Sequence, residues 1–277
     1  MSDFTGQRVA FRELHKSGCF VMPNPWDVGT AKYLRKLGFQ ALATTSAGFG
    51  FSHGLPDTPA ALTRARVLTH IAEIVAAAEE LPVNADFQSG YAANPEDVAE
   101  NVRLCIETGV AGLSIEDATD DLDDPLYELT QATDRIRAAR AAIDFSGADV
   151  LLTARAECFL VGHPDALRES IHRLQAYAEA GAHVLFAPGP CERDDIRAIV
   201  ESVKPKPVNV LMSAYTGLRV PDLAELGVRR ISVGSALARA AWAGFLRAAR
   251  QITEEGSFAG LEGAVPFAEL NSLFAVP

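Results

Sequence analysis

The sequence predicts an α/β fold of the (β/α)8 TIM-barrel type, and three observations carry that prediction. Eight short apolar runs alternate with helical patterns along the 277 residues, which is typical of a parallel sheet. Glycines stand at several of the joins between a helix and the next strand. Barrels of this type hold roughly 250 residues in one domain. We therefore expect a barrel domain over residues 1–252 and a helical tail of the same domain over residues 253–277.

Strands are predicted where apolar residues cluster between turn residues, and helices where apolar residues recur at helical spacing. The clearest helix begins at Asn94, an N-cap residue followed by a proline and two acids. Residues 46–50 are predicted as a glycine-rich turn, and Arg135 and Arg140 are expected to face solvent. The expected strands are residues 18–22, 40–45, 82–86, 111–115, 150–154, 183–187, 207–212 and 229–234. The expected helices are residues 5–16, 28–37, 59–80, 94–108, 129–143, 165–180, 194–202, 220–226, 236–252 and 266–274.

Composition and charge narrow the range of functions. The net charge of -11 and the absence of a cluster of basic residues argue against a nucleic-acid surface. Four cysteines without C-x-x-C spacing indicate neither a zinc site nor a disulfide framework. The region near Met1 does not resemble a signal peptide, and no apolar run is long enough to span a membrane. We expect a soluble, cytoplasmic protein.

Acidic and amide side chains end two neighbouring predicted strands. Asn84 and Asp86 close the third strand, and Glu116 and Asp117 follow the fourth. Ligands of parallel sheets bind beyond the carboxyl ends of the strands, so these side chains indicate a site. Asp86 and Glu116 are hard oxygen ligands that suit Mg²⁺. The alternative is that the acids only cap helices or form ion pairs in loops.

The other strand ends add a chemically coherent set. Arg155 is placed to hold a substrate carboxylate, because an arginine buried there needs an acid or an anionic ligand. Backbone N–H groups near Ser46 to Gly48 are candidates to stabilise an oxyanion. Trp26 has the alternative of packing at the barrel rim, and Ser46 that of an ordinary turn residue. The remaining residues at these ends are Asp27, Pro188, Asn209 and Gly234.

Two segments lie outside this pattern. Residues 118–125 form an acidic loop in which Asp120, Asp121, Asp123 and Asp124 surround Leu122. The helices predicted at 236–252 and 266–274 are apolar, and we expect them to bury against a partner subunit or their own barrel.

An ordered set of motifs from about residue 18 to residue 252 resembles the isocitrate lyase/phosphoenolpyruvate mutase superfamily. The motifs are Pro25-Trp26-Asp27, Ser46-Ala47-Gly48-Phe49-Gly50, Leu55-Pro56-Asp57, Asn84-Ala85-Asp86 with Gly90-Tyr91, Ser114-Ile115-Glu116-Asp117 and Ala154-Arg155. The resemblance implies an enzyme dependent on Mg²⁺, with Mn²⁺ as an alternative, that makes or breaks carbon-carbon or phosphorus-carbon bonds through a pyruvate-like enolate. It also implies a homotetramer, with a dimer as the alternative, in which C-terminal helices are exchanged between subunits.

The resemblance also implies roles for individual residues. The predicted metal site comprises Asp86, Glu116 and Asn84; the predicted substrate pocket comprises Trp26, Ser46, Ala47, Gly48, Arg155 and Asn209; the predicted catalytic residues are Arg155, Ser46, Asp57 and Glu116.

Two departures from the superfamily pattern matter. The usual D-x-D appears as Asn84-Ala85-Asp86, so an amide without net charge replaces one carboxylate. The loop at 118–125 has no cysteine to act as a catalytic acid, which argues against cleavage of isocitrate or methylisocitrate. Ala118 and Thr119 also do not supply the basic residue that the mutases have there.

The sequence is therefore consistent with three functional hypotheses. The leading hypothesis is a Mg²⁺-dependent lyase or decarboxylase acting on a small 2-keto or 2-hydroxy (di)carboxylate. The second is phosphorus-carbon chemistry, as a phosphonopyruvate/phosphoenolpyruvate mutase or hydrolase. The third is a non-catalytic binder of 2-keto acids, favoured if Asn84 has abolished metal binding.

Overall fold

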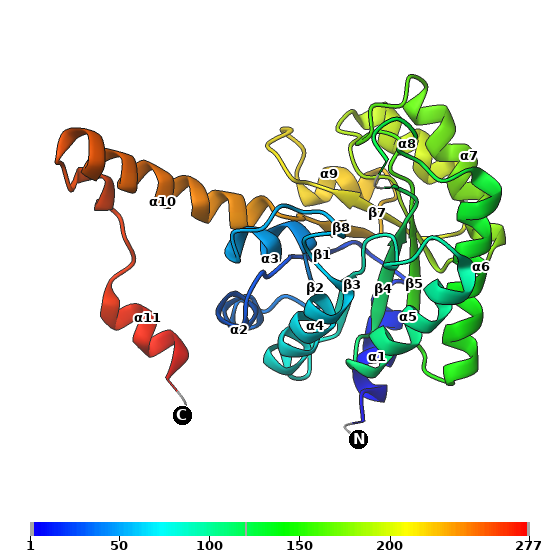
Figure 1. Ribbon diagram of the computed structural model, residues 1–277, viewed down its shortest axis with the longest axis horizontal. Coiled ribbons are helices and arrows are strands. Elements are labelled where there is room, and N and C mark those ends of the chain that lie inside the picture. The colour runs from blue at the N-terminus through cyan, green and yellow to red at the C-terminus, as the bar shows by residue number, and fades with distance from the viewer. Residues whose placement is uncertain (1–2, 120, 276–277) are drawn as a thin grey trace.

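A computed structural model describes residues 3–119 and 121–275 and confirms the predicted barrel (Figure 1). Asp120 of the acidic loop and residues 1, 2, 276 and 277 lie outside the described residues. The strands are all parallel, in the order β1-β8-β7-β6-β5-β4-β3-β2. They are β1 Phe20–Met22, β2 Leu42–Ala43, β3 Val83–Asp86, β4 Gly112–Glu116, β5 Leu151–Arg155, β6 Val184–Phe186, β7 Val208–Leu211 and β8 Arg230–Ser232.

The barrel is nearly closed between β1 and β2. One backbone hydrogen bond crosses there, from the Ala43 N–H to the Pro23 carbonyl at 3.0 Å. Asn24 adds a side-chain link, since its amide nitrogen donates to the Thr44 carbonyl at 2.8 Å. Its amide oxygen accepts from the N–H groups after β8, at Val233 and Gly234, both at 2.9 Å. One buried amide therefore ties three strand ends together at the rim that carries the site.

The helices form where capping groups and apolar spacing predict them, with one exception. Asn94 caps α5 by accepting from the Asp97 N–H at 2.8 Å, as predicted. The turn predicted at 46–50 is wrong: this segment is helix α3, because the Thr45 hydroxyl caps it by accepting from the Gly48 N–H. The helices are α1 Thr5–Leu14, α2 Val28–Lys36, α3 Ser46–Ser52, α4 Arg64–Ala78, α5 Pro95–Glu107, α6 Leu129–Ser146, α7 Ala166–Glu179, α8 Arg193–Ser202, α9 Val220–Glu225, α10 Ala236–Glu255 and α11 Phe267–Phe274, with a short 3-10 helix at Ala259–Leu261.

Helix α1 closes the barrel at the amino-terminal ends of the strands. Its Phe11 is fully buried and packs with apolar residues of the strands, including Phe20 and Leu151. The barrel wall leaves room for this ring at Gly112, where an added Cβ would lie 2.6 Å from Phe11 Cε1. Helix α1 thus forms a plug at this end of the barrel, which we call the α1 plug, and the opposite end can hold a cavity.

Arg135 is buried, so the prediction that it faces solvent is wrong. Its guanidinium donates to the carbonyls of Glu116 at 3.2 Å and Ala92 at 3.1 Å, and also to that of Ser89. It lies 4.0 Å from the centre of the Tyr127 ring. These partners compensate the burial of the charge and fasten the loop after β3 to the end of β4. Arg140 is partly buried, with hydrogen bonds to Asp144.

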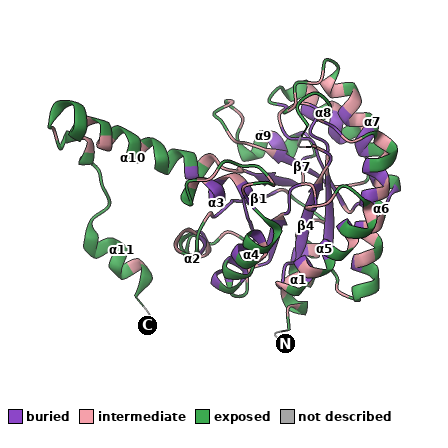
Figure 2. Ribbon diagram, in the orientation of Figure 1, coloured by how far each residue is buried: buried purple, intermediate pink, exposed green. Residues whose placement is uncertain are grey.

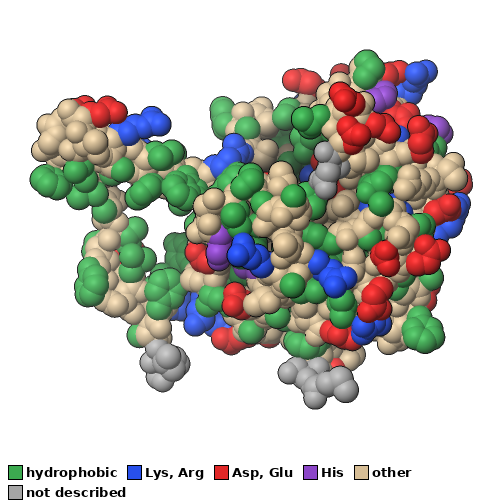
Figure 3. Space-filling view, viewed as in Figure 1, with side chains coloured by type: hydrophobic (Ala, Val, Ile, Leu, Met, Phe, Trp, Pro, Cys, Tyr) green, Lys and Arg blue, Asp and Glu red, His purple; other side chains and the backbone are tan. Residues whose placement is uncertain are grey.

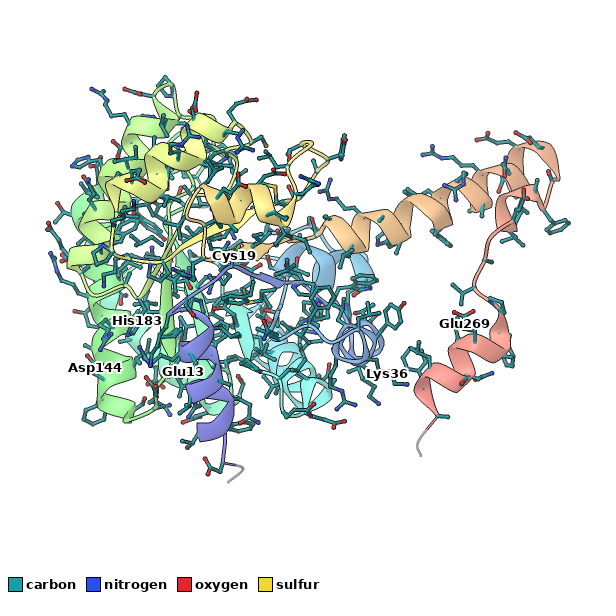
Figure 4. The ribbon with its side chains drawn as sticks, turned by 180° about the vertical axis from the view of Figure 1, so that it is seen from behind. Glu13, Cys19, Lys36, Asp144, His183 and Glu269 are labelled. Carbon is teal, nitrogen blue, oxygen red and sulfur yellow. The ribbon has the colours of Figure 1, made fainter. Side chains whose placement is uncertain are left out.

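The C-terminal segment projects from the barrel (Figures 1 and 2). Helix α10 is largely exposed, and hydrophobic side chains gather on this segment in Figure 3. Helix α11 returns toward α2, where the Lys36 ammonium donates to the Leu273 carbonyl; Figure 4 labels Lys36 on α2 and Glu269 on α11. Residue 252, the predicted end of the barrel domain, lies within α10. Among the described residues, no helix has the length and apolar character needed to cross a membrane.

The burial of His70 predicts that the free energy of unfolding falls in mild acid. His70 is 5% exposed and stacks on Phe49 with 4.0 Å between ring centres. Burial, reinforced by His53, lowers the pKa of His70 to about 4. The unfolded chain therefore binds this proton more readily, so the free energy of unfolding should fall as pH drops from 6.5 to 4, by about 3 kcal/mol from this group.

The substitution His70→Leu should flatten this pH dependence, as measured by urea unfolding at steps between pH 7 and pH 4. His172→Leu, at an exposed position, serves as the matched control and should leave the slope unchanged. Equal slopes for wild type and His70→Leu would show that burial of His70 does not set its protonation.

Candidate active site

A cavity of about 530 Å³ lies at the carboxyl-terminal ends of the strands. Eight of the ten predicted site residues line it, and two do not. Trp26 and Gly48 are absent from its walls. The residues that line it are Ser46, Ala47, Asp57, Asn84, Asp86, Glu116, Arg155 and Asn209.

Trp26 and Gly48 pack together behind the cavity wall. A Cβ added at Gly48 would lie 2.7 Å from the Thr45 methyl carbon and 3.0 Å from the Trp26 Cβ. The glycine therefore allows α3 to approach Trp26 closely. Trp26 therefore packs beside α3 and outside the cavity lining, and its role in the substrate pocket stays a prediction.

Asp86, the last residue of β3, is held by Ser46. The Ser46 N–H and hydroxyl both donate to Asp86 Oδ2 at 3.0 Å, and the Asp86 N–H donates to the Thr44 hydroxyl at 2.8 Å. The Gly48 N–H is engaged by Thr45. Of the N–H groups predicted near Ser46 to Gly48 to stabilise an oxyanion, those of Ser46 and Gly48 have partners within the protein, and Ser46 also orients a carboxylate.

Three carboxylates surround the Arg155 guanidinium at the end of β5. Glu116 Oε2 lies 3.1 Å and Asp86 Oδ1 3.6 Å from Arg155 Nη1. Glu157 accepts from Nε and, at 3.1 Å, from Nη2. The sequence analysis did not single out Glu157. Its spacing of two residues from Arg155 is the pattern by which two side chains of an extended segment point to the same side. Arg155 therefore has its counter-ions within the protein.

Asp57 brings a fourth carboxylate to the cavity from the loop between α3 and α4. Gln88 Nε2 donates to Asp57 Oδ1 at 3.0 Å. Gln88 has a φ of 44°, a left-handed conformation that glutamine rarely adopts. Loss of solvent around the carboxyl group and the nearby charge of Asp86 raise the pKa of Asp57. Asp57 is thus suited to hold or take up a proton at the cavity edge.

The site carries more negative charge than Arg155 balances. Burial raises the pKa of Glu116 well above its usual range, and the charges of Glu157, Asp86 and Asp57 add to it while Arg155 opposes them. Burial also raises the pKa of Glu157. Four carboxylates facing one guanidinium favour either shared protons or an additional cation.

The donor set fits a hydrated divalent cation. Asp86, Glu116 and Asp57 supply hard oxygens, and the buried Asn84 Oδ1 has no hydrogen-bond partner within the described ranges. Over those same residues, no three His, Cys, Asp or Glu side chains converge closely enough to form a complete metal cage. Mg²⁺ commonly takes one or two carboxylates and keeps several waters, so it does not require such a cage.

Asp117 lies behind the site and supports it. The Asp117 carboxylate is 2% exposed and accepts from the Glu157 N–H at 2.8 Å, Arg173 at 3.1 Å and the Tyr177 hydroxyl at 2.6 Å. It fixes the backbone that presents Glu157 to Arg155. Its role at the predicted face is therefore to anchor the site.

The cavity with its carboxylates and arginine lies at the carboxyl ends of the strands, where (β/α)8-barrel enzymes have their active sites. The family model described as phosphoenolpyruvate phosphomutase matches residues 11–253. The chain belongs to this family, within the isocitrate lyase/phosphoenolpyruvate mutase superfamily, as the sequence motifs predicted. It is an enzyme of the lyase and mutase type.

Several relatives extend this similarity. An uncharacterized protein of Mycobacterium tuberculosis is 32% identical over 95% of each chain. A solved structure of a candidate lyase/mutase from Burkholderia cenocepacia has a TM-score of 0.94 and 47% identity over 99% of each chain. The 2,3-dimethylmalate lyase of Eubacterium barkeri is 30% identical over 73% of this chain and 69% of its own. The superfamily also includes lyases named for methylisocitrate and oxaloacetate, and phosphonomutases, and its members are typically dependent on a divalent metal.

Removing the anchor should destabilise the protein. The substitution Asp117→Ala leaves the Tyr177 hydroxyl and part of the Arg173 charge buried without a partner, at a cost of about 3–5 kcal/mol in the free energy of unfolding. Urea denaturation measures this difference. Asp134→Ala, which removes an exposed ion pair with Arg137, should cost less than about 0.5 kcal/mol. Equal losses in the two variants would contradict the anchoring role.

Proposed function

We propose that this protein is a Mg²⁺-dependent carbon-carbon lyase or decarboxylase that acts on a small 2-keto or 2-hydroxy (di)carboxylate through a pyruvate-type enolate. The observation that carries the proposal is the surplus of carboxylates around Arg155 in the cavity. This excess of negative charge suits a divalent cation. A substrate acid that chelates the cation would complete its coordination. The relative named 2,3-dimethylmalate lyase supports the choice of carbon-carbon chemistry.

Each residue then has a distinct task. Asp86 and Glu116 would hold the cation, with Asn84 as a neutral oxygen deeper on β3. Bound there, the cation supplies positive charge for an oxygen of the substrate on which negative charge develops. Ser46 keeps Asp86 oriented through two hydrogen bonds. Arg155 is fixed by its three acids and presents its remaining N–H to the substrate carboxylate.

Asp57 is the candidate for proton transfer. Its carboxyl group lines the cavity, its pKa is raised, and Gln88 fixes its orientation. A carboxyl group with a raised pKa exchanges protons closer to neutral pH than an ordinary aspartate does. We assign it the role of acid or base for the carbon atom that gains or loses a bond.

Phosphorus-carbon chemistry is the second candidate, favoured by the description of the matching family model. The loop after β4 argues against it. Leu122 of this loop lines the cavity, and its neighbours Asp121 and Asp123 put further negative charge near the place where a phosphonate would have to approach. Turnover of phosphonopyruvate decides between the two chemistries.

The first test is pyruvate release from oxaloacetate, 2-methylisocitrate, dimethylmalate and phosphonopyruvate, with Mg²⁺ and with a chelator. We expect metal-dependent release from one of the carbon-carbon substrates. Asp86→Ala should lower kcat at least roughly a hundredfold, because several kcal/mol of charge stabilisation would be lost. Asp123→Ala, in the acidic loop, is the control and should retain turnover. Undiminished turnover by Asp86→Ala would rule out the metal site, and silence across the panel with tight keto-acid binding would favour a binding protein.

We also infer that the chain self-associates through its C-terminal helices, as a homotetramer or a dimer. Trp242 and Phe245 lie edge to face with 5.3 Å between ring centres, and Phe245 is 60% exposed. Phe258 and Phe267 are 69% and 84% exposed on the segment that follows. Apolar side chains on a helix that projects from the barrel are the expected contact surface for a second copy of the chain.

Light scattering after size-exclusion chromatography should give a mass above the monomer for the wild type. Phe245→Glu should lower that mass, because it buries a charge in the contact. Arg250→Glu changes charge on the same helix and should leave the mass unchanged. A monomeric wild type would contradict self-association.

A further inference from the structure

Arg230 is a buried arginine that the proposed chemistry does not use. It lies on β8 and is 1% exposed. Its Nε donates to Asn209 Oδ1 at 2.8 Å, and its Nη2 donates to the Thr153 hydroxyl at 3.0 Å. Its Nη1 lies 3.4 Å from His15 Nε2. These three contacts use three of the five guanidinium N–H groups and leave two free.

All three partners of Arg230 are neutral. Asn209 and Thr153 carry no charge. The Asn209 amide nitrogen donates to the Ser232 hydroxyl at 2.9 Å, so both ends of the amide have partners. His15 Nδ1 lies 2.7 Å from the Phe11 carbonyl, so Nδ1 carries the proton and Nε2 accepts. Over residues 3–119 and 121–275, Arg230 forms no salt bridge with a carboxylate.

The other buried arginines of the described chain, Arg135 and Arg173, and the partly buried Arg155 are compensated. Arg155 faces three carboxylates, and Arg173 pairs with Asp117 and Glu169. Arg135 gives its hydrogen bonds to three carbonyls beneath the Tyr127 ring and does not line the cavity. A buried charge without a counter-ion is costly unless a ligand supplies one.

The cavity reaches Arg230 through polar walls. Asn84, Ser114, Asn209 and Ser232 line it together with Arg230. Thr153, the partner of Arg230, precedes Arg155 by two residues on β5, which places it roughly 6.6 Å deeper along the strand. Below lies the α1 plug, since the His15 ring packs on Phe11 with 4.7 Å between centres. Arg230 therefore lies at the floor of the cavity, and the acids lie at its mouth.

We propose that Arg230 forms an anion subsite at the floor of the cavity and binds the distal carboxylate of a linear dicarboxylate whose other end reaches the Asp86 and Glu116 site. The choice of a dicarboxylate rests on the proposed function; binding of an anion by Arg230 does not. Three arginines line the cavity. Arg239 is exposed at its mouth, Arg155 has its counter-ions within the protein, and Arg230 is buried and has none, so Arg230 has the greatest capacity for an anionic ligand.

Calorimetry with succinate and butyrate tests the subsite directly, because the two acids have the same number of carbons and differ by one carboxylate. With Mg²⁺ present, the wild type should bind succinate at least tenfold more tightly than butyrate. Arg230→Met should remove this preference, and Arg230→Lys should keep part of it. Arg239→Met is the matched control, an exposed arginine at the cavity mouth that donates to the Ser213 carbonyl at 2.6 Å, and it should retain the preference.

A second variant keeps the test decisive if Arg230→Met does not fold. Asn209→Asp places a carboxylate on Arg230 Nε and supplies the missing counter-ion within the protein. It should raise the melting temperature and also abolish the preference for succinate. A wild type that binds both acids equally, or an Asn209→Asp protein that still prefers succinate tenfold, would overturn the subsite.

Pyruvate release is measured separately on the same proteins. An enzyme that binds succinate through Arg230 and releases no pyruvate from the substrate panel would refute the proposed reaction and leave the subsite in place. Pyruvate release from oxaloacetate or dimethylmalate, with kcat/KM unchanged in Arg230→Met, would refute the subsite and leave the reaction in place.

Discussion

The site depends on the attraction between one guanidinium and the carboxylates that face it. Arg155 holds Glu116, Glu157 and Asp86 together, although burial alone would disfavour the charged forms of Arg155, Glu116 and Glu157. Much of the surrounding fold keeps this arrangement in place. Ser46 fixes Asp86, Asp117 fixes the backbone of Glu157, and Arg135 ties the loop after β3 to the end of β4. The remaining negative charge is what gives the cavity its capacity for a cation.

The barrel interior has two regions of opposite charge. Its mouth is acidic, with three carboxylates around Arg155 and a fourth, that of Asp57, at the cavity edge, and its floor has a single arginine among neutral groups. Burial lowers the pKa of Arg230 to about 9, so the guanidinium is still charged at neutral pH. A molecule with a metal-chelating end and an anionic end matches this distribution better than a molecule with one charged end. The two regions are separated along the strands, so one ligand can contact both.

The barrel and most of the cavity residues could be predicted from the sequence, because strand ends and helix caps are local patterns. Asn94 predicts the start of α5, and Asp86 and Glu116 at the strand ends indicate the site. The missed helix α3 depends on a local cap, by Thr45, whereas the other errors concern partners that are distant in sequence. Arg135 falls on a helix and could have been exposed, and only the carbonyls of another loop make its burial possible. Arg230 belongs to a three-residue strand, too short for its alternation to show which side chains face inward.

Asn84 and Arg230 are better explained together than apart. An aspartate at residue 84 would put a carboxylate among the groups that line the cavity together with Arg230 and would offset part of the positive charge there. The amide leaves that region with one positive charge and an unpartnered oxygen. Loss of a metal ligand at Asn84 would therefore have two effects, a weaker hold on the cation and a floor open to an anion. If a chelating substrate supplies the oxygen ligands that Asn84 lacks as an amide, part of the metal coordination passes from the protein to the substrate. Arg230 would then help to select that substrate.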